Sequence, residues 1–205
     1  MATAVYTPEL SFHGSLHWHM PDGNPAVHGL SASYIEQAPT ALDNGWVFCS
    51  AKDTYSGLKR IALGLDEVSG RLVGLQFWFA CYFCGEAAGL SRYRYDVRVF
   101  QQPQHANPFQ FYKLEVSRNG YLGLYQSDSP HGFRVLQDSD LWELEGLDPW
   151  ELQGGASVPA LGLISPPRRP VRRLVEEGFP YLSDRDGHDA RFTLTVEPNG
   201  LERPW

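Results

Sequence analysis

Three histidines early in the chain have the type and spacing to do chemistry. His13, His17 and His19 lie in segment 9–20, where apolar and polar residues alternate. Because side chains alternate faces along a strand, this pattern predicts one strand with all three histidines opposite its apolar face. Histidines two residues apart on a strand lie about 7 Å apart between Cα atoms, close enough to bind one ion. The sequence predicts a metal site of these three residues with His28, for zinc or another divalent transition metal.

The same histidine face has two other interpretations. Imidazole titrates near neutral pH, so His17 and His19 are candidate acid and base catalysts, with Arg94 holding an anionic substrate group. In the third interpretation the face is exposed to solvent and its histidines are ordinary polar residues. Residue types alone do not choose among metal binding, proton transfer and a hydrated surface.

Aromatic side chains provide a second candidate site. The chain contains 6 Trp, 10 Tyr and 11 Phe, and aromatic rings bury large areas and stack on ligands. Tyr93 and Tyr95 fall on one face of an alternating segment, while Trp46 and Trp78 belong to two other predicted strands. We expect these four residues to line a pocket for a small molecule or a sugar.

Cys81 and Cys84 form a CxxC motif whose context argues against metal or redox chemistry. The motif lies in a long apolar segment predicted to be the central strand, where residues three apart point to opposite faces. Cys49 is the only other cysteine. We therefore expect three small core residues, and this low, odd count indicates a reducing compartment.

A strongly acidic segment precedes a cluster of arginines. Residues 138–151 hold six carboxylates and no basic residue, and four arginines follow between 168 and 173. We expect the two segments to pair and to hold a long loop in place. If they do not pair, the acidic segment, which also carries Trp142 and Trp150, offers a surface to a basic protein partner or a sugar.

The candidate site residues described above are expected to lie on short strands. The 20 Gly and 15 Pro separate short alternating segments, which is typical of an all-β domain. Between 127 and 190 the alternation weakens, which predicts a loop-rich excursion with a short helix over 170–177. Asn119 and Gly120 predict a hairpin with a type I′ turn. The expected strands cover 9–20, 30–37, 46–51, 61–65, 71–83, 92–100, the hairpin 111–126, and 191–197.

The predicted fold is therefore all-β. We expect one domain over 1–205, built as a single antiparallel β-sandwich or closed β-barrel. It carries a long irregular insertion over 127–190 and at most one or two short helices. The 205 residues are enough for one sizeable core.

Charge and hydropathy exclude some partner classes. A net charge of −7 has the wrong sign for a general nucleic-acid binder. No stretch reaches the roughly 18 apolar residues of a membrane helix, and the first residues lack the features of a signal peptide. We therefore expect an acidic cytoplasmic protein with neither nucleic acid nor membrane as partner.

Three function classes remain open. The first is a binding domain whose aromatic-lined sheet holds a small molecule or carbohydrate. The second is an enzyme that uses the histidine face, with or without a metal ion, in the mouth of a barrel. The third is an acidic inhibitor or immunity-type protein that binds a basic protein partner. The sequence favours them in this order and does not decide whether the protein is an enzyme.

Overall fold

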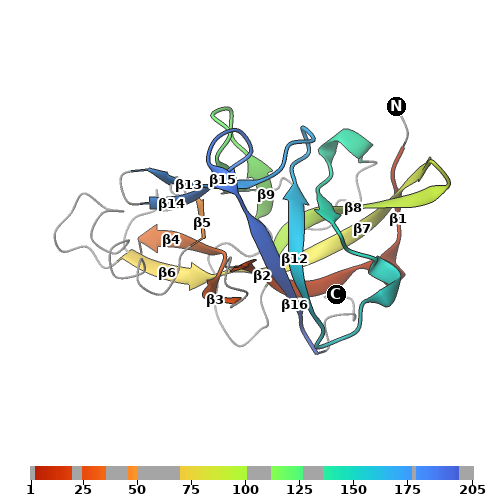
Figure 1. Cartoon of the computed structure of the whole chain (residues 1–205), viewed down its shortest axis with the longest axis horizontal. Helices are drawn as coiled ribbons and strands as arrows, with labels where there is room; N and C mark the ends of the chain where they lie inside the picture. The colour runs from red at the N-terminus through yellow and green to blue at the C-terminus, as the bar shows by residue number, and fades with distance from the viewer. Residues whose placement is uncertain are drawn as a thin grey trace.

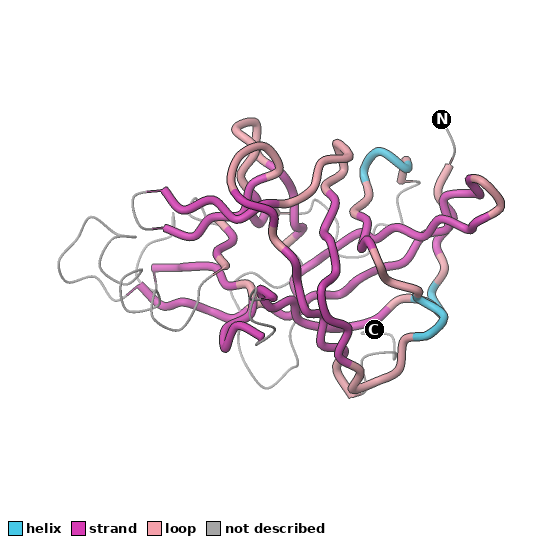
Figure 2. The backbone as a smooth tube through the Cα atoms, viewed as in Figure 1, coloured by secondary structure: helices cyan, strands magenta, loops and turns pink. Residues whose placement is uncertain are grey.

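The computed structural model describes residues 3–19, 25–35, 46–49, 70–100, 112–126, 136–176 and 179–198, and only their backbone at 25–28, 31, 33–35, 70–73 and 179. The described chain is mainly strand, and its helical segments are 3-10 turns of three residues (Figure 2). All strand pairs are antiparallel. The predicted all-β fold is confirmed. No described helix is both long and apolar enough to span a bilayer.

Ten strands form the first sheet (Figure 1). The longest, β7 and β8, form a hairpin at its centre. Along its main path the order is β10 (Leu122–Tyr125), β9 (Lys113–Val116), β8 (Leu90–Phe100), β7 (Gln76–Ala87), β2 (Phe12–His19), β16 (Arg191–Val196), β12 (Ser157–Ile164) and β11 (Glu143–Glu145); β1 (Val5–Tyr6) pairs with β7 and β3 (Pro25–Gly29) with β2.

The second sheet has six strands and shares a core with the first. Leu75 separates β6 from β7, and its N–H donates to the carbonyl of Leu30, the residue that separates β3 from β4. The chain therefore passes twice between the sheets at this point. The strand order is β15 (His188–Asp189), β13 (Arg172–Glu176), β14 (Phe179–Ser183), β5 (Val47–Phe48), β4 (Ser31–Ile35) and β6 (Gly70–Gly74).

The first sheet curves until its β11 end returns to β8. Tyr95 on β8 and Trp142, just before β11, form an isolated antiparallel bridge, and no ladder extends from it in the described residues. A bulge between Val158 and Leu161, with Ala160 at φ 57°, bends β12. Of the two predicted architectures, the described strands agree with the sandwich, because neither sheet closes through a continuous ladder. We call the line between β8 and β11 the β8–β11 seam.

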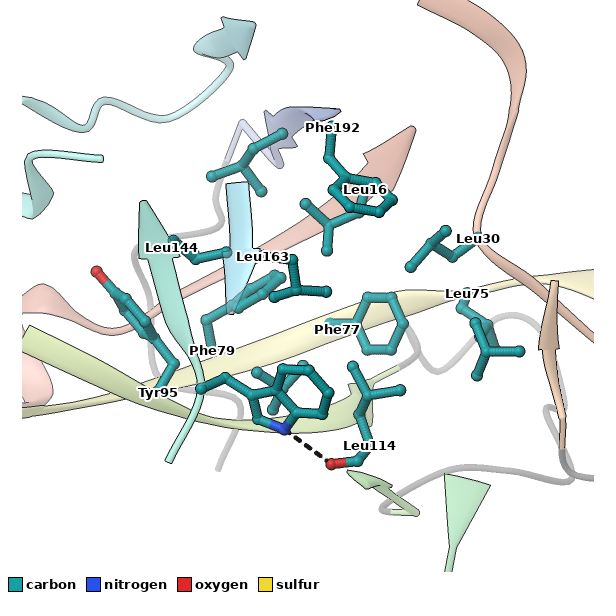
Figure 3. Packing of buried hydrophobic residues seen from close by; sticks show 14 of the residues in the cluster. Leu16, Leu30, Leu75, Phe77, Phe79, Tyr95, Leu114, Leu144, Leu163 and Phe192 are labelled. Atoms are coloured by element: carbon teal, nitrogen blue, oxygen red, sulfur yellow. Dashed lines mark hydrogen bonds between the residues drawn. The ribbon is translucent and has the colours of Figure 1, made fainter. Parts of the chain in front are cut away.

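Two apolar clusters lie on opposite faces of β7, as its doubly apolar sequence predicts. Phe77, Phe79 and Cys81 point into the main core, where the Trp142 indole donates to the carbonyl of Leu114 at 2.9 Å (Figure 3). Cys84 points into a smaller cluster on the other face, so the two cysteines of the CxxC motif are separated, as expected. The smaller cluster contains Ala4, Trp78, Ala80, Tyr82, Cys84 and Leu141.

Several details of the predicted elements need correction. The helix expected over 170–177 is wrong, because Arg172–Glu176 is strand β13, paired along its whole length with β14. Tertiary pairing here overrides local helix signals. The segment 71–83 is not one strand, because the chain changes sheets at Leu75. The interval 127–190 contributes five strands where the sequence indicated mainly loop, and the strand expected at 61–65 lies outside the described residues.

Candidate functional site: a groove at the β8–β11 seam

A groove of about 650 Å³ opens along the β8–β11 seam. Leu90 to Tyr95 of β8 form one wall and residues 143–150 form the other, with Ala87 at one end. This volume falls within the range of small-molecule sites. Its two walls come from segments about 50 residues apart in the chain.

The groove exists because β8 and β11 stop pairing after one bridge. Tyr95 and Trp142 exchange both backbone hydrogen bonds, at 2.8 and 2.9 Å. In an antiparallel ladder the next such pair would be Tyr93 and Leu144. Instead, the Leu144 carbonyl accepts from the N–H of Leu147 at 3.2 Å, in a turn where Gly146 has φ 90°. The chain therefore turns away from β8 and leaves space between the strands.

A short capped turn then brings an aromatic ring back over the groove. Pro149–Glu151 is the 3-10 turn η4, and Asp148 accepts from the backbone N–H of Trp150 at 3.0 Å. The Trp150 indole donates to the hydroxyl of Tyr93 at 3.1 Å, and the rings meet edge to face at 6.3 Å. Trp150 is nonetheless 64% exposed, and Leu90, another residue of the groove lining, is 72% exposed. A fixed indole with a free surface is a good platform for a ligand.

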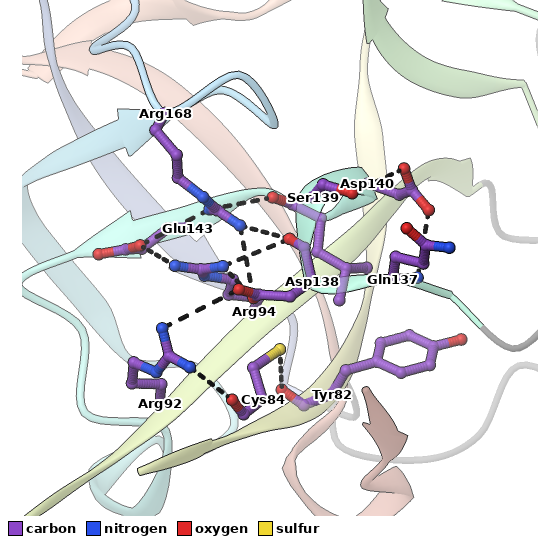
Figure 4. A network of polar contacts seen from close by, with 11 residues as sticks. Tyr82, Cys84, Arg92, Arg94, Gln137, Asp138, Ser139, Asp140, Glu143 and Arg168 are labelled. Atoms are coloured by element: carbon purple, nitrogen blue, oxygen red, sulfur yellow. Dashed lines mark hydrogen bonds and ion pairs between the residues drawn. The ribbon is translucent and has the colours of Figure 1, made fainter. Parts of the chain in front are cut away.

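Arg94 and Glu143 of the groove lining also belong to a cluster of opposite charges centred on Asp138 (Figure 4). Arg94, whose side chain is only 8% exposed, contacts Asp138 and lies 3.4 Å from Glu143. Arg168 reaches the same two carboxylates at 3.4 and 3.8 Å. Burial raises the pKa of Asp138, but the Cys84 thiol and the guanidinium groups of Arg94 and Arg168 outweigh it and hold the net value below its ordinary range.

This cluster confirms in part the predicted pairing of the acidic segment with the later arginines. Arg168 pairs with that segment, whereas Arg172 faces Asp189 at 3.7 Å. Arg173 lies 4.3 Å above the Trp18 ring and donates to the carbonyl of Cys49. The later arginines therefore divide between the acidic segment and the second sheet.

Of the four aromatic residues predicted to contact a ligand, two line the groove and two do not. Tyr93 and Tyr95 line the groove, together with Arg94. Burial raises the pKa of Tyr95 well above its ordinary value, and the Cys81 thiol and Asp148 add to this rise. Trp78 is 2% exposed in the smaller cluster, and Trp46 forms a bridge with Gly123 of β10. Neither tryptophan belongs to the groove lining.

Sequence reasoning noted Trp150 in the acidic segment but did not place it with Tyr93 and Tyr95 among the predicted ligand contacts. The residue lies in the acidic segment, and its position depends on the turn at Gly146 and on the cap at Asp148. The Asp-Pro pair at 148–149 is a start signal for a helical turn and was the one local cue to its placement.

The histidines share one face of β2, as predicted, but each has different surroundings. His13 is buried, stacked on Phe100 at 3.9 Å, and burial lowers its pKa to about 4. His17 Nε2 lies 3.0 Å from the Ser15 hydroxyl, and His19 Nδ1 lies 3.0 Å from that of Thr193.

Metal binding and catalysis at this face remain predictions. Within the described part of the chain, no three His, Cys, Asp or Glu side chains are placed to hold a metal ion. His28 lies on β3, but its side chain is outside the described residues. No described histidine belongs to the groove lining.

No family model, curated protein or solved structure matches this chain.

Proposed function

We propose that this protein binds a small molecule, most favourably a carbohydrate, in the groove at the β8–β11 seam. The observation that carries this proposal is the Trp150 indole, held edge to face by Tyr93 while most of its surface faces solvent. Large aromatic side chains are normally buried, and one that is both fixed and exposed inside a groove has area to offer a ligand.

The chemistry of the walls fits a ligand that is apolar on one side and rich in hydroxyls on the other. The Trp150 ring offers a flat apolar surface, and Glu143 and Asp148 offer carboxylate oxygens. The backbone N–H and C=O of Tyr95 point to the seam, where they bond Trp142. Alternate residues of a strand direct these groups to the same side, so Tyr93 offers its own N–H and C=O to the groove. A sugar ring presents a C–H face for stacking and hydroxyls around its edge, which matches this combination.

We favour binding over catalysis because of where the candidate acid and base groups lie. The histidines of β2 lie outside the groove, and Tyr95 is buried with its pKa raised away from neutrality. Groups tuned for proton transfer have pKa values near the working pH.

The test is a titration of intrinsic fluorescence with neutral and amino-substituted oligosaccharides chosen from a glycan array. We expect binding to perturb the Trp150 emission and the change Trp150→Ala to weaken binding about tenfold or more. Tyr125→Ala is the matched control, since Tyr125 is a partly exposed aromatic on β10, outside the groove. An array without binders, or affinity that survives Trp150→Ala, would overturn the proposal.

A second candidate, binding of a basic protein partner, is favoured by one observation. The exposed carboxylates of Glu145, Asp148 and Glu151 lie on or next to the groove wall that also carries Trp150. Such a complex forms quickly and weakens steeply with salt. A partner of this kind would compete with a sugar for the same groove.

A further inference from the structure

We propose that the ligand group recognised over Trp150 is a cation, an ammonium or guanidinium group held between the indole face and the carboxylate of Asp148. This inference rests on the proposed function and names the ligand chemistry of the same groove. An amino sugar and a lysine or arginine side chain of a partner protein both carry such a group.

The first support is that Asp148 is the groove carboxylate least engaged by the protein. Asp138 and Glu143 are shared by Arg94 and Arg168. Asp148 instead caps η4 through one oxygen, and no described basic side chain pairs with it. Glu145 pairs with Arg191 at 2.7 Å, but both side chains are about half exposed. An exposed pair of this kind exchanges readily with water.

The second support is that the arginines of the groove wall are directed away from this carboxylate. Arg94 is buried against Asp138 and Glu143. Arg92 donates to the carbonyl of Cys84 at 2.8 Å, and its other terminal nitrogen lies 3.9 Å from Asp138. Figure 4 shows the guanidinium groups converging on Asp138. Three guanidinium groups are therefore engaged around Asp138, whereas no described basic side chain pairs with Asp148.

The third support is the fixed relation between carboxylate and ring. Asp148 and Trp150 are two residues apart in one capped turn, and the indole is tied to Tyr93 by its N–H. Tryptophan is the best aromatic partner for a cation, and an adjacent carboxylate adds charge attraction in the same place. The field of Asp148 extends into the groove, since it contributes to the raised pKa of Tyr95.

The experiment compares a tetramer of glucosamine with a tetramer of N-acetylglucosamine at about pH 6, where amines are protonated and most carboxylates ionised. We expect the amino form to bind about fivefold more tightly and to lose this advantage in about 0.5 M salt. Asp148→Asn should abolish the preference while keeping the cap, because Asn is an equally good N-cap residue. Glu151→Gln is the matched control, an exposed carboxylate next to Trp150 but not in the groove lining.

A pentapeptide with one central lysine, and its lysine-acetylated form, separates the two sources of the cation. Peptide binding that needs Asp148, Trp150 and a free lysine amine, without sugar binding, supports the cation site and overturns the carbohydrate proposal. Equal affinity for the two tetramers, or a preference unchanged in Asp148→Asn, overturns the cation site and leaves carbohydrate binding intact. If neither peptide nor sugar binds, both proposals fail.

Discussion

Tyr95 and Trp142 exchange two backbone hydrogen bonds, and this single bridge determines where the β8–β11 seam begins to open. Both side chains belong to the main core, with Trp142 fully buried. The Trp142 indole also donates to the carbonyl of Leu114 on β9. One residue thus joins β8, β9 and the start of β11, so the groove opens from a rigid point.

The change Trp142→Phe should destabilise the fold, since it replaces a fully buried indole by a smaller ring without a polar group. It removes the donor to the buried Leu114 carbonyl, and a buried acceptor without a partner costs about 1–3 kcal/mol. Urea unfolding measures the loss. Trp150→Phe, at an exposed site, should change stability by less than about 0.5 kcal/mol. Equal effects of the two changes would contradict the assigned role of Trp142.

Arg94 should matter for stability far more than an exposed arginine. Arg94→Met leaves Asp138 and Glu143 without their most buried partner, and we expect a loss of about 2–4 kcal/mol in the free energy of unfolding. Arg191→Met breaks the exposed pair with Glu145 and should cost less than about 1 kcal/mol. Thermal and urea unfolding of the two variants make the comparison, which fails if Arg191→Met costs as much.

The β7–β8 turn offers a stabilising change. Ala87 pairs with Leu90, so Ala88 and Gly89 form a two-residue turn, with φ of 52° and 78°. Alanine is strained at positive φ, so Ala88→Gly should stabilise the protein by about 0.5–1 kcal/mol. Ala87→Gly, in extended strand, should destabilise it slightly. Unfolding midpoints that move in the same direction for both variants would refute this explanation.

His13 should make the protein sensitive to acid. Burial lowers its pKa from 6.5 to about 4, so between these values the unfolded chain binds more protons than the folded one. Its contribution is fully present above pH 6.5 and is lost as the pH falls toward 4, by up to about 3 kcal/mol. His13→Phe removes the titrating group and keeps a ring against Phe100.

The measurement for His13 is the free energy of unfolding as a function of pH. The His13→Phe variant should lose less stability than the natural chain between pH 6.5 and 4. His188→Gln is the control, because it replaces an exposed histidine instead of a buried one. Parallel curves for the natural chain and His13→Phe would show that His13 does not contribute.

The three cysteines should be unreactive in the folded protein. Cys49, Cys81 and Cys84 are buried, and burial raises the pKa of each thiol to about 12. Since the thiolate is the reactive form, a disulfide reagent should modify none of them until the protein is unfolded in denaturant. Rapid modification of any thiol under native conditions would contradict this burial.

The strands of the first sheet could be predicted where one face, or both, meets the core. The alternation of β2 and β8 indicated two strands near their true bounds, whereas the predicted strand 71–83 covers most of β6 and the first part of β7. The hairpin around Gly120 was also predicted, but its type I′ turn was wrong. Only Gly120 has positive φ there, and its N–H donates to the carbonyl of Ser117. Asn119 tolerates several turn types, and the flanking residues decide among them.

The later strands and the groove could not be predicted, for physical reasons. The bulge at Ala160 interrupts the alternation of β12, and the two arginines of β13 hide its pairing with β14. The groove depends on where β8 and β11 separate, which is a property of two segments about 50 residues apart. Local sequence shows Tyr93 and Tyr95 as candidates, but it contains no signal that Trp150 lies over Tyr93.

The bulge in β12 also determines how this strand tolerates insertions and deletions. Leu161 and Leu163 are buried in the core, and Val158 packs against the same core although it lies an odd number of residues away. Losing one residue at Ala160 would remove the bulge and restore regular alternation, with Val158 two residues from Leu161 and still on the core face. A single-codon deletion there would keep the faces of β12, whereas the same deletion inside β16, whose register with β2 is regular, would turn part of that strand inside out.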